Sequence, residues 1–125
     1  ILFDALVKMD SLTGTSQKFK FPEGCFGSEM QFAPRHNSNA EDDGYLISFV
    51  TNMDSMKGEI QIFPAEDLSK GPLAKVIVPQ QIPPGFHSSF VLPENLELLN
   101  DFKKVYIFIF PIYILIFCRC LFWRK

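Results

Sequence analysis

Short segments with strand-like side chains recur along the first 80 residues, and turn-forming residues separate them. Residues 17–21 (Gln-Lys-Phe-Lys-Phe) alternate polar and aromatic side chains, which is the two-residue period of a half-buried strand. Clusters of Asp, Asn, Gly and Pro lie between the segments. The expected strands cover residues 5–9, 17–21, 29–33, 45–50, 59–63 and 73–78, the first two forming a hairpin over residues 4–21. Strands this short and closely spaced predict an all-β, antiparallel fold of the sandwich, barrel or propeller type.

Charge and cysteine content argue against a nucleic-acid-binding protein and against a fold built on disulfides or a cysteine metal site. The 125 residues carry a net charge of −2 and form no basic stripe, so we exclude nucleic acid as a partner. The cysteines, Cys25, Cys118 and Cys120, lack metal-binding spacing, and their odd number gives no disulfide framework. The chain starts without methionine, signal peptide or transit sequence, so we expect it to be a fragment.

Residues 105–123 differ from the rest of the chain because they are almost wholly hydrophobic. Their length is enough to cross a bilayer as a helix at ~1.5 Å per residue, and basic residues flank both ends. Pro111 and Arg119 oppose this interpretation, since an arginine held at the bilayer centre costs ~2.5–3.5 kcal/mol. A membrane anchor and a buried or aggregating segment are therefore two alternatives.

Translation of an intron is the third explanation for this tail. Monotonous Phe, Ile, Tyr and Leu result when T-rich and A-rich DNA is translated. Lys104-Val105, where the composition changes abruptly, can be encoded by AAG-GTN, the sequence expected at the start of an intron. Sequencing of the transcript tests this explanation, because a mature message that joins another exon after Lys104 would confirm it.

Two histidines are present, and their surroundings differ. His87 ends the turn Ile82-Pro83-Pro84-Gly85-Phe86-His87, in which two prolines fix φ and Gly85 permits a backbone conformation closed to other residues. One imidazole cannot hold a catalytic metal alone, so the other ligands would lie outside this chain if His87 is a ligand. An ordinary histidine packed at a turn is the alternative. His36 lies in a polar loop and is expected not to contact a metal.

Four stretches of the chain resemble the C-terminal end of the carotenoid cleavage oxygenases. They are Phe-Gly-Ser-Glu-Met-Gln-Phe-Ala-Pro-Arg (26–35), Ala-Glu-Asp-Asp-Gly-Tyr-Leu (40–46), Glu-Asp-Leu (66–68) and Val-Pro-Gln-Gln-Ile-Pro-Pro-Gly-Phe-His (78–87). Their order and spacing are similar to those of the family. It includes carotenoid and apocarotenoid dioxygenases, lignostilbene dioxygenases and the retinal pigment epithelium isomerase. The resemblance covers residues 1 to about 92.

The resemblance implies a fold and a metal site. The fold is a seven-bladed β-propeller, of which this chain would form the last one to two blades, and four histidines on its axis bind Fe(II). His87 matches the last of these ligands. Glu29 matches the last of three glutamates that hydrogen-bond the other ring nitrogens of the ligands, a contact that orients an imidazole and raises its basicity. Without the resemblance, Glu29 is as well explained as a solvated surface charge. The acidic turn 41–43 is expected to be structural and not a calcium site.

The resemblance also implies an activity. The parent enzyme would use Fe(II) and O₂ to cleave a conjugated double bond of a lipophilic polyene, a carotenoid or apocarotenoid. Because this chain holds one ligand of four, we expect it to be inactive by itself. Pro84 and Ser88-Ser89 depart from the residues usual in the family, which leaves the substrate subtype open. A membrane-anchored β module without enzymatic activity and a metal-free interaction module are the alternative functions.

We divide the chain into three parts. Residues 1–92 are expected to form the propeller blades, residues 93–104 a polar linker or short helix, and residues 105–125 the hydrophobic tail, which is helical if it spans a membrane. The cellular compartment is not determined. A plant member of the family would lie in the plastid or the cytoplasm, with membrane association.

Overall fold

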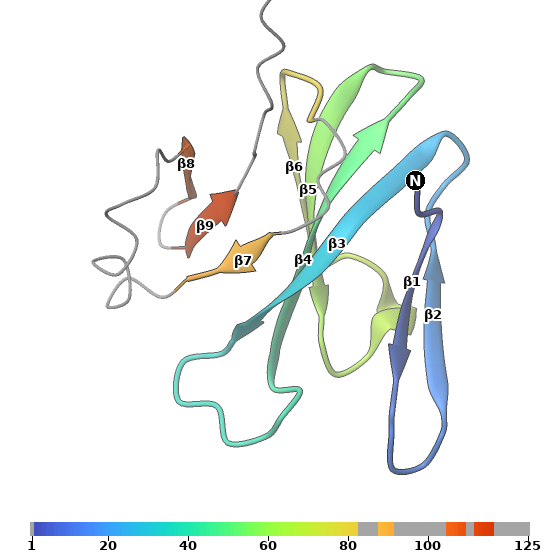
Figure 1. The fold of residues 1–125 in the computed structure, drawn as a ribbon, viewed down its shortest axis with the longest axis vertical. Helices are drawn as coiled ribbons and strands as arrows, with labels where there is room; N and C mark the ends of the chain where they lie inside the picture. The colour runs from blue at the N-terminus through green and yellow to red at the C-terminus, as the bar shows by residue number, and fades with distance from the viewer. Residues whose placement is uncertain (1, 83–87, 92–104, 110–111, 117–125) are drawn as a thin grey trace, which may run out of the picture. The chain divides into compact units, whose positions relative to one another are not determined.

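The computed structural model describes residues 2–82, 88–91, 105–109 and 112–116. The chain divides into two compact units, residues 1–86 and residues 87–125. The first unit contains a β-hairpin and a four-stranded sheet with strand order β3-β4-β5-β6 (Figure 1). The hairpin strands are β1 (Ala5–Met9) and β2 (Ser16–Lys20), and the sheet strands are β3 (Cys25–Pro34), β4 (Gly44–Asn52), β5 (Lys57–Pro64) and β6 (Ala74–Val78). Every pairing is antiparallel, which confirms the expected all-β class.

Local turn chemistry explains where these strands end. The carboxylate of Asp10 accepts hydrogen bonds from the backbone N–H groups of Leu12 and Thr13, and Gly14 takes a positive φ of 71° to close the β1–β2 turn. Between β4 and β5, the side-chain oxygen of Asn52 likewise accepts hydrogen bonds from the backbone N–H groups of Asp54 and Ser55. The connection between β5 and β6 contains a short 3₁₀ helix, Leu68–Lys70, capped by Asp67. Short polar side chains thus set the strand boundaries.

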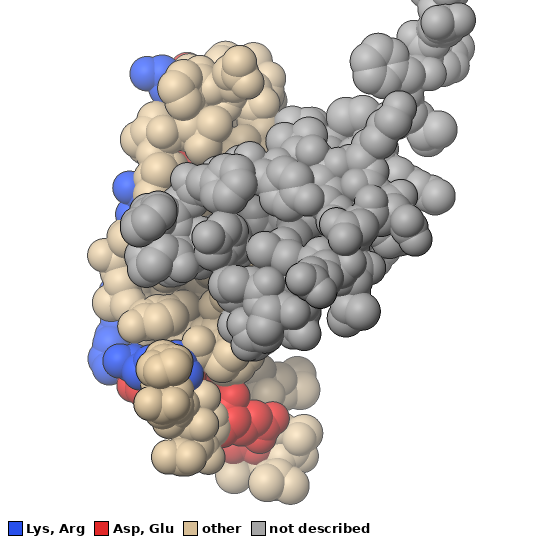
Figure 2. Space-filling view, turned by 90° about the vertical axis from the view of Figure 1, so that its left-hand side faces the viewer, with Lys and Arg blue, Asp and Glu red and all other residues tan. Residues whose placement is uncertain are grey.

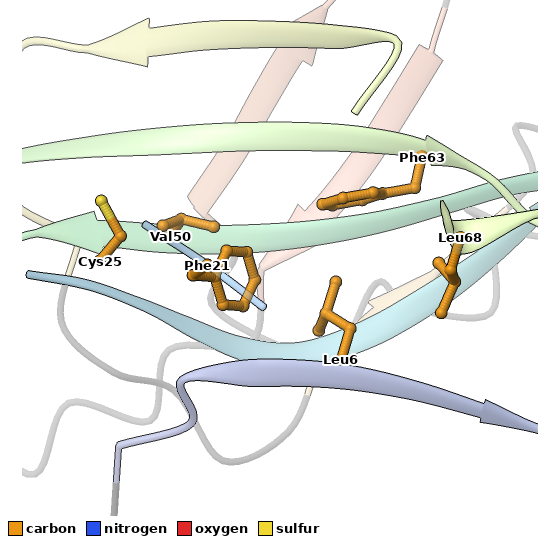
Figure 3. Close-up of a cluster of buried hydrophobic side chains, with 6 residues drawn as sticks. All are labelled: Leu6, Phe21, Cys25, Val50, Phe63 and Leu68. Carbon is orange, nitrogen blue, oxygen red and sulfur yellow. The ribbon is translucent and has the colours of Figure 1, made fainter. Parts of the chain in front are cut away.

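The core of the first unit lies between the hairpin and the sheet. Figure 3 shows six buried side chains that converge there, namely Leu6, Phe21, Cys25, Val50, Phe63 and Leu68. Phe63 is fully buried, and its ring lies 5.0 Å from that of Phe19 and 6.5 Å from that of Phe21, both in edge-to-face arrangements. Such aromatic pairs stabilise packing by ~0.5–1.5 kcal/mol beyond the burial of their area. The hairpin is therefore attached to the sheet by an aromatic cluster.

Gly27 on β3 contacts the two residues that flank the hairpin, Phe3 and Phe21. A Cβ at this position would lie 2.5 Å from Cε2 of Phe21. The backbone N–H of Gly27 donates to the carbonyl of Phe3 over 2.8 Å. A larger residue would push the Phe21 ring out of the core, so glycine is required here by space and not by a positive φ.

The second unit contains a three-stranded antiparallel sheet with strand order β7-β9-β8. Its strands are β7 (Ser89–Phe90), β8 (Val105–Ile109) and β9 (Ile112–Ile116). The hydrophobic tail therefore contains strands at 105–109 and 112–116, where a spanning helix was one expectation. The β-branched and aromatic residues of these segments favour strands over helices. No helix in the described part of the chain is long and apolar enough to cross a membrane. The polar linker or short helix expected at residues 93–104 lies outside the described residues.

Candidate metal-supporting site

Glu29 lies at a β-bulge on β3. Gly27 pairs with Val50 and Met30 pairs with Ser48, so two residues of β3, Ser28 and Glu29, oppose the single residue Phe49 of β4. A bulge of this kind offsets the alternation of side chains along a strand, and bulges are common beside active sites, where they redirect a side chain. Glu29 is exposed to solvent at this position.

The bulge has a measurable effect on the side chains around it. Cys25 and Met30 are five positions apart, an odd number, so a regular strand would direct them to opposite faces. Both nevertheless pack on the same core cluster. The extra residue in β3 accounts for this arrangement. Glu29 lies at the point where the alternation of side chains between the two faces of the strand shifts by one residue.

Two serines bond to the backbone at the bulge. The Ser28 hydroxyl accepts a hydrogen bond from the backbone N–H of Phe49 over 3.2 Å and donates one to the carbonyl of Glu29 over 3.1 Å. The hydroxyl of Ser48, which is fully buried, donates to the carbonyl of Ser28 over 3.3 Å. The backbone groups that the irregular pairing removes from the ladder thus find side-chain partners.

The segment that precedes His87 is attached to β4 and β5. Thr51 and Gly58 are direct cross-strand partners. The Thr51 hydroxyl donates to the carbonyl of Ile82 over 2.8 Å, and the Gly58 N–H donates to the carbonyl of Gln80 over 3.0 Å. Gly58 also leaves room for Ile82, because a Cβ there would lie 2.4 Å from Ile82 Cγ1. We call residues 51, 58, 80 and 82 the clasp.

The clasp and the bulge lie next to each other. Ser28, Thr51 and Ile82 line the same small hollow in the first unit. Ile82 precedes His87 by five residues, and His87 itself lies outside the described residues. The metal-ligand prediction for His87 therefore stays a prediction, and so does the role of Glu29, whose neighbour Ser28 lines the hollow with Ile82.

The acidic turn forms ion pairs within the first unit. Asp42 pairs with Lys8 at 2.7 Å, and Asp43 pairs with Arg35 at 2.8 Å. Lys8 also donates to the carbonyl of Ala65 over 2.7 Å, so it joins the hairpin to the end of β5. The hydrogen bond and charge of Lys8 hold the pKa of Asp42 below its usual value. Figure 2 shows acidic and basic side chains near the lower end of the view.

His36 and Cys25 do not belong to a group that could hold a metal within the described residues. His36 is exposed in the β3–β4 loop. Cys25 is buried as a free cysteine, and burial, followed by the negative charge of Glu59, raises the pKa of its thiol. A protonated, buried thiol is a packing residue and a poor ligand. No group of three His, Cys, Asp or Glu that could hold a metal occurs in the part of the chain that the structure describes.

The sequence patterns did not indicate a buried polar pair on β5. The Gln61 side-chain amide donates to the Glu59 carboxylate over 2.7 Å, and both residues are buried. Their alternation with Ile60 and Ile62 is as expected of a strand with one solvated face. The burial of Glu59 and Gln61 depends on β5 being a central strand of the sheet, and only the order of the strands in space establishes this.

Comparison with known proteins identifies the family. Residues 1–92 match the family described as retinal pigment epithelial membrane protein. The chain is 41% identical over 81 residues to the carotenoid 9,10(9′,10′)-cleavage dioxygenase of Crocus sativus, covering 63% of this chain and 15% of that protein. It is 41% identical over 75 residues to the carotenoid 9,10(9′,10′)-cleavage dioxygenase 1 of Arabidopsis thaliana, covering 60% of this chain and 14% of that protein.

Solved structures agree with this relationship. A variant of the Synechocystis apocarotenoid oxygenase superposes with a TM-score of 0.66 at 30% identity, covering 70% of this chain and 18% of the other. The cobalt-substituted form of that oxygenase gives the same TM-score, identity and coverage. The chain therefore belongs to the carotenoid cleavage oxygenase family and spans about 15% of the length of its curated relatives.

Proposed function

We propose that residues 1–92 supply part of the active site of a non-haem Fe(II) dioxygenase. His87 would bind the metal, and Glu29 would hydrogen-bond the other ring nitrogen of one of the histidine ligands. The observation that carries this proposal is the small hollow that Ser28 and Ile82 both line, because Ser28 directly precedes Glu29 and Ile82 lies five residues before His87. Five residues span at most ~18 Å, so position 87 lies no farther than that from Ile82.

The two side chains fit this division of labour. An imidazole must be neutral to bind a metal, and its second nitrogen must then be held in one tautomer. A carboxylate at Glu29 would accept that N–H and raise the basicity of the ligand. Bound Fe(II) would supply open coordination positions at which dioxygen is activated for addition across a double bond. The similarity to a carotenoid cleavage dioxygenase and to an apocarotenoid oxygenase supports a carotenoid or apocarotenoid as the polyene substrate. Membrane association stays a prediction.

We further propose that the 125-residue chain alone is inactive. It corresponds to about 15% of the related Crocus sativus enzyme, and one histidine ligand of four cannot retain a catalytic metal. Purified chain should bind no stoichiometric Fe(II) and should cleave no carotenoid. Tight Fe(II) binding with turnover would contradict this part of the proposal.

The ligand assignments can be tested in a chimera that contains the missing ligands. Residues 1–92 of this chain would replace the matching segment of the Crocus sativus dioxygenase. His87→Ala should abolish iron retention, and Glu29→Gln should weaken Fe(II) affinity by about 10–100-fold. His36→Ala is the matched control, because His36 lies in an exposed loop. Unchanged iron content in the His87→Ala chimera would remove the assignment of His87 as a ligand.

A further inference from the structure

The position of Glu29 depends on an irregular backbone that a regular ladder would abolish. If β3 and β4 paired without interruption, one residue and not two would oppose Phe49, and Glu29 would shift by one place in the alternation. Side chains on a strand point to opposite faces at successive positions. A carboxylate that must meet an imidazole therefore requires the bulge to be kept in place.

Ser28 is suited to keep it there. Its hydroxyl accepts from the Phe49 N–H and donates to the Glu29 carbonyl, so one side chain bonds both strands at the point of irregularity. Phe49 is 7% exposed, and an unpaired N–H at this depth would be costly. The carbonyl of Ser28 in turn accepts from Ser48.

We propose that Ser28 is a positioning residue for the metal site, and that it acts by holding the β-bulge that directs Glu29. This inference rests on the proposed function of Glu29 and adds a residue to it. Ser28 itself touches neither metal nor substrate in this scheme. Its contribution should appear only when Glu29 carries a carboxylate, which separates positioning from a general effect on stability.

A double-mutant cycle in the chimera tests this dependence. Fe(II) dissociation constants would be measured by competition with a chelator, and thermal midpoints recorded, for Ser28→Ala, Glu29→Gln and the double variant. Ser28→Ala should weaken Fe(II) binding by about 2–10-fold, the effect of losing a hydrogen bond at one site. In the Glu29→Gln background the same change should have no further effect. Ser28→Thr keeps the hydroxyl and should restore the affinity to within about 2-fold.

Two controls accompany the cycle. Ser16→Ala removes an exposed serine from strand β2 and should leave Fe(II) binding unchanged. Hydrogen exchange at the Phe49 amide reports on the bulge without any metal and should become severalfold faster in Ser28→Ala. If Ser28→Ala does not fold, Ser28→Cys keeps the size of the side chain and weakens its hydrogen bonds, and it should lower the affinity in the same direction.

The outcomes separate this inference from the proposed function. If the unaltered chimera retains no iron, the proposed function is refuted, and the role of Ser28 is refuted with it. If the chimera retains iron but Ser28→Ala or Ser28→Cys leaves the Fe(II) dissociation constant unchanged, only the positioning role of Ser28 is refuted. An equal loss of affinity with and without the Glu29 carboxylate also overturns it, because Ser28 would then act on stability and not through Glu29.

Discussion

Gly58→Ala offers a quantitative test of the clasp that holds the segment before His87. The added Cβ would lie 2.4 Å from Cγ1 and 2.7 Å from Cδ1 of Ile82, and 3.0 Å from the carbonyl oxygen of Gln80. Gly58 does not have a positive φ, so alanine fits its backbone conformation. Any loss of stability must therefore come from the contact with the clasp and not from backbone strain.

Two responses to the added methyl group are available, and they cost similar amounts. If the segment stays in place, overpacking costs about 1–3 kcal/mol. If it moves away, the hydrogen bonds from Thr51 and Gly58 are lost, at about 0.5–1.5 kcal/mol each. We therefore expect Gly58→Ala to lower the free energy of unfolding by about 1–3 kcal/mol. Urea unfolding of the 125-residue chain, followed by far-ultraviolet circular dichroism, measures this quantity.

A second substitution identifies the cause. Ile82→Ala removes both of the side-chain atoms nearest to the new methyl group, so the cost of Gly58→Ala should fall by at least about 1 kcal/mol in that background. Gly14→Ala is the matched control: its φ is +71° and no heavy atom lies within 4 Å of the added Cβ. Its cost, about 1–2 kcal/mol, arises from the backbone and should not depend on Ile82. Strict additivity of Gly58→Ala and Ile82→Ala would refute the steric reasoning.

Two further substitutions test the first unit. Asp42→Asn should lower the Tm at neutral pH, because the pairing with Lys8 lowers the pKa of Asp42. The difference in Tm from the unaltered chain should shrink as the pH falls below 3.8 and through the lowered pKa. A difference in Tm that persists in acid would contradict the ion-pair explanation. Phe63→Ala should cost about 3–5 kcal/mol in urea unfolding, since Phe63 is 0% exposed. Phe63→Leu should cost less but still lower the stability, because leucine keeps most of the apolar burial and loses the ring contacts; a Phe63→Leu variant as stable as the unaltered chain would argue against the aromatic cluster.

Several strands were predictable because their signals are local. The hairpin over residues 4–21 follows from the alternation of Gln17–Phe21 and from turn residues such as Asp10 and Gly14, all of which act within a few positions. The full length of β3 was not predictable. The strand begins at Cys25 and not at the expected residue 29, and the bulge between Gly27 and Met30 interrupts the alternation of side chains between these two positions. For the hydrophobic tail, the length of the segment alone did not predict the secondary structure. Its length fitted a spanning helix, but residues 105–109 and 112–116 form strands.

The candidate site was only partly accessible from the sequence. The roles of His87 and Glu29 came from a resemblance of motifs, and the family is confirmed for residues 1–92. Neither the bulge at Glu29 nor the role of Ser28 could be read from the chain, because a bulge is defined by a partner strand. The hydrogen bond of Ser28 to Phe49 joins residues 21 positions apart.

The sequence by itself determined the strand-and-turn pattern and the all-β class, and a resemblance of motifs in it gave the predicted roles of His87 and Glu29. Tertiary structure alone decided which strands are neighbours, that Glu59 and Gln61 are buried, and that Thr51 and Gly58 hold the segment before His87. The physical reason is the range of the interactions. Periodicity and turn chemistry act over a few residues, whereas the clasp joins Thr51 to Ile82 across 31 positions, a contact that exists only after the sheet has formed.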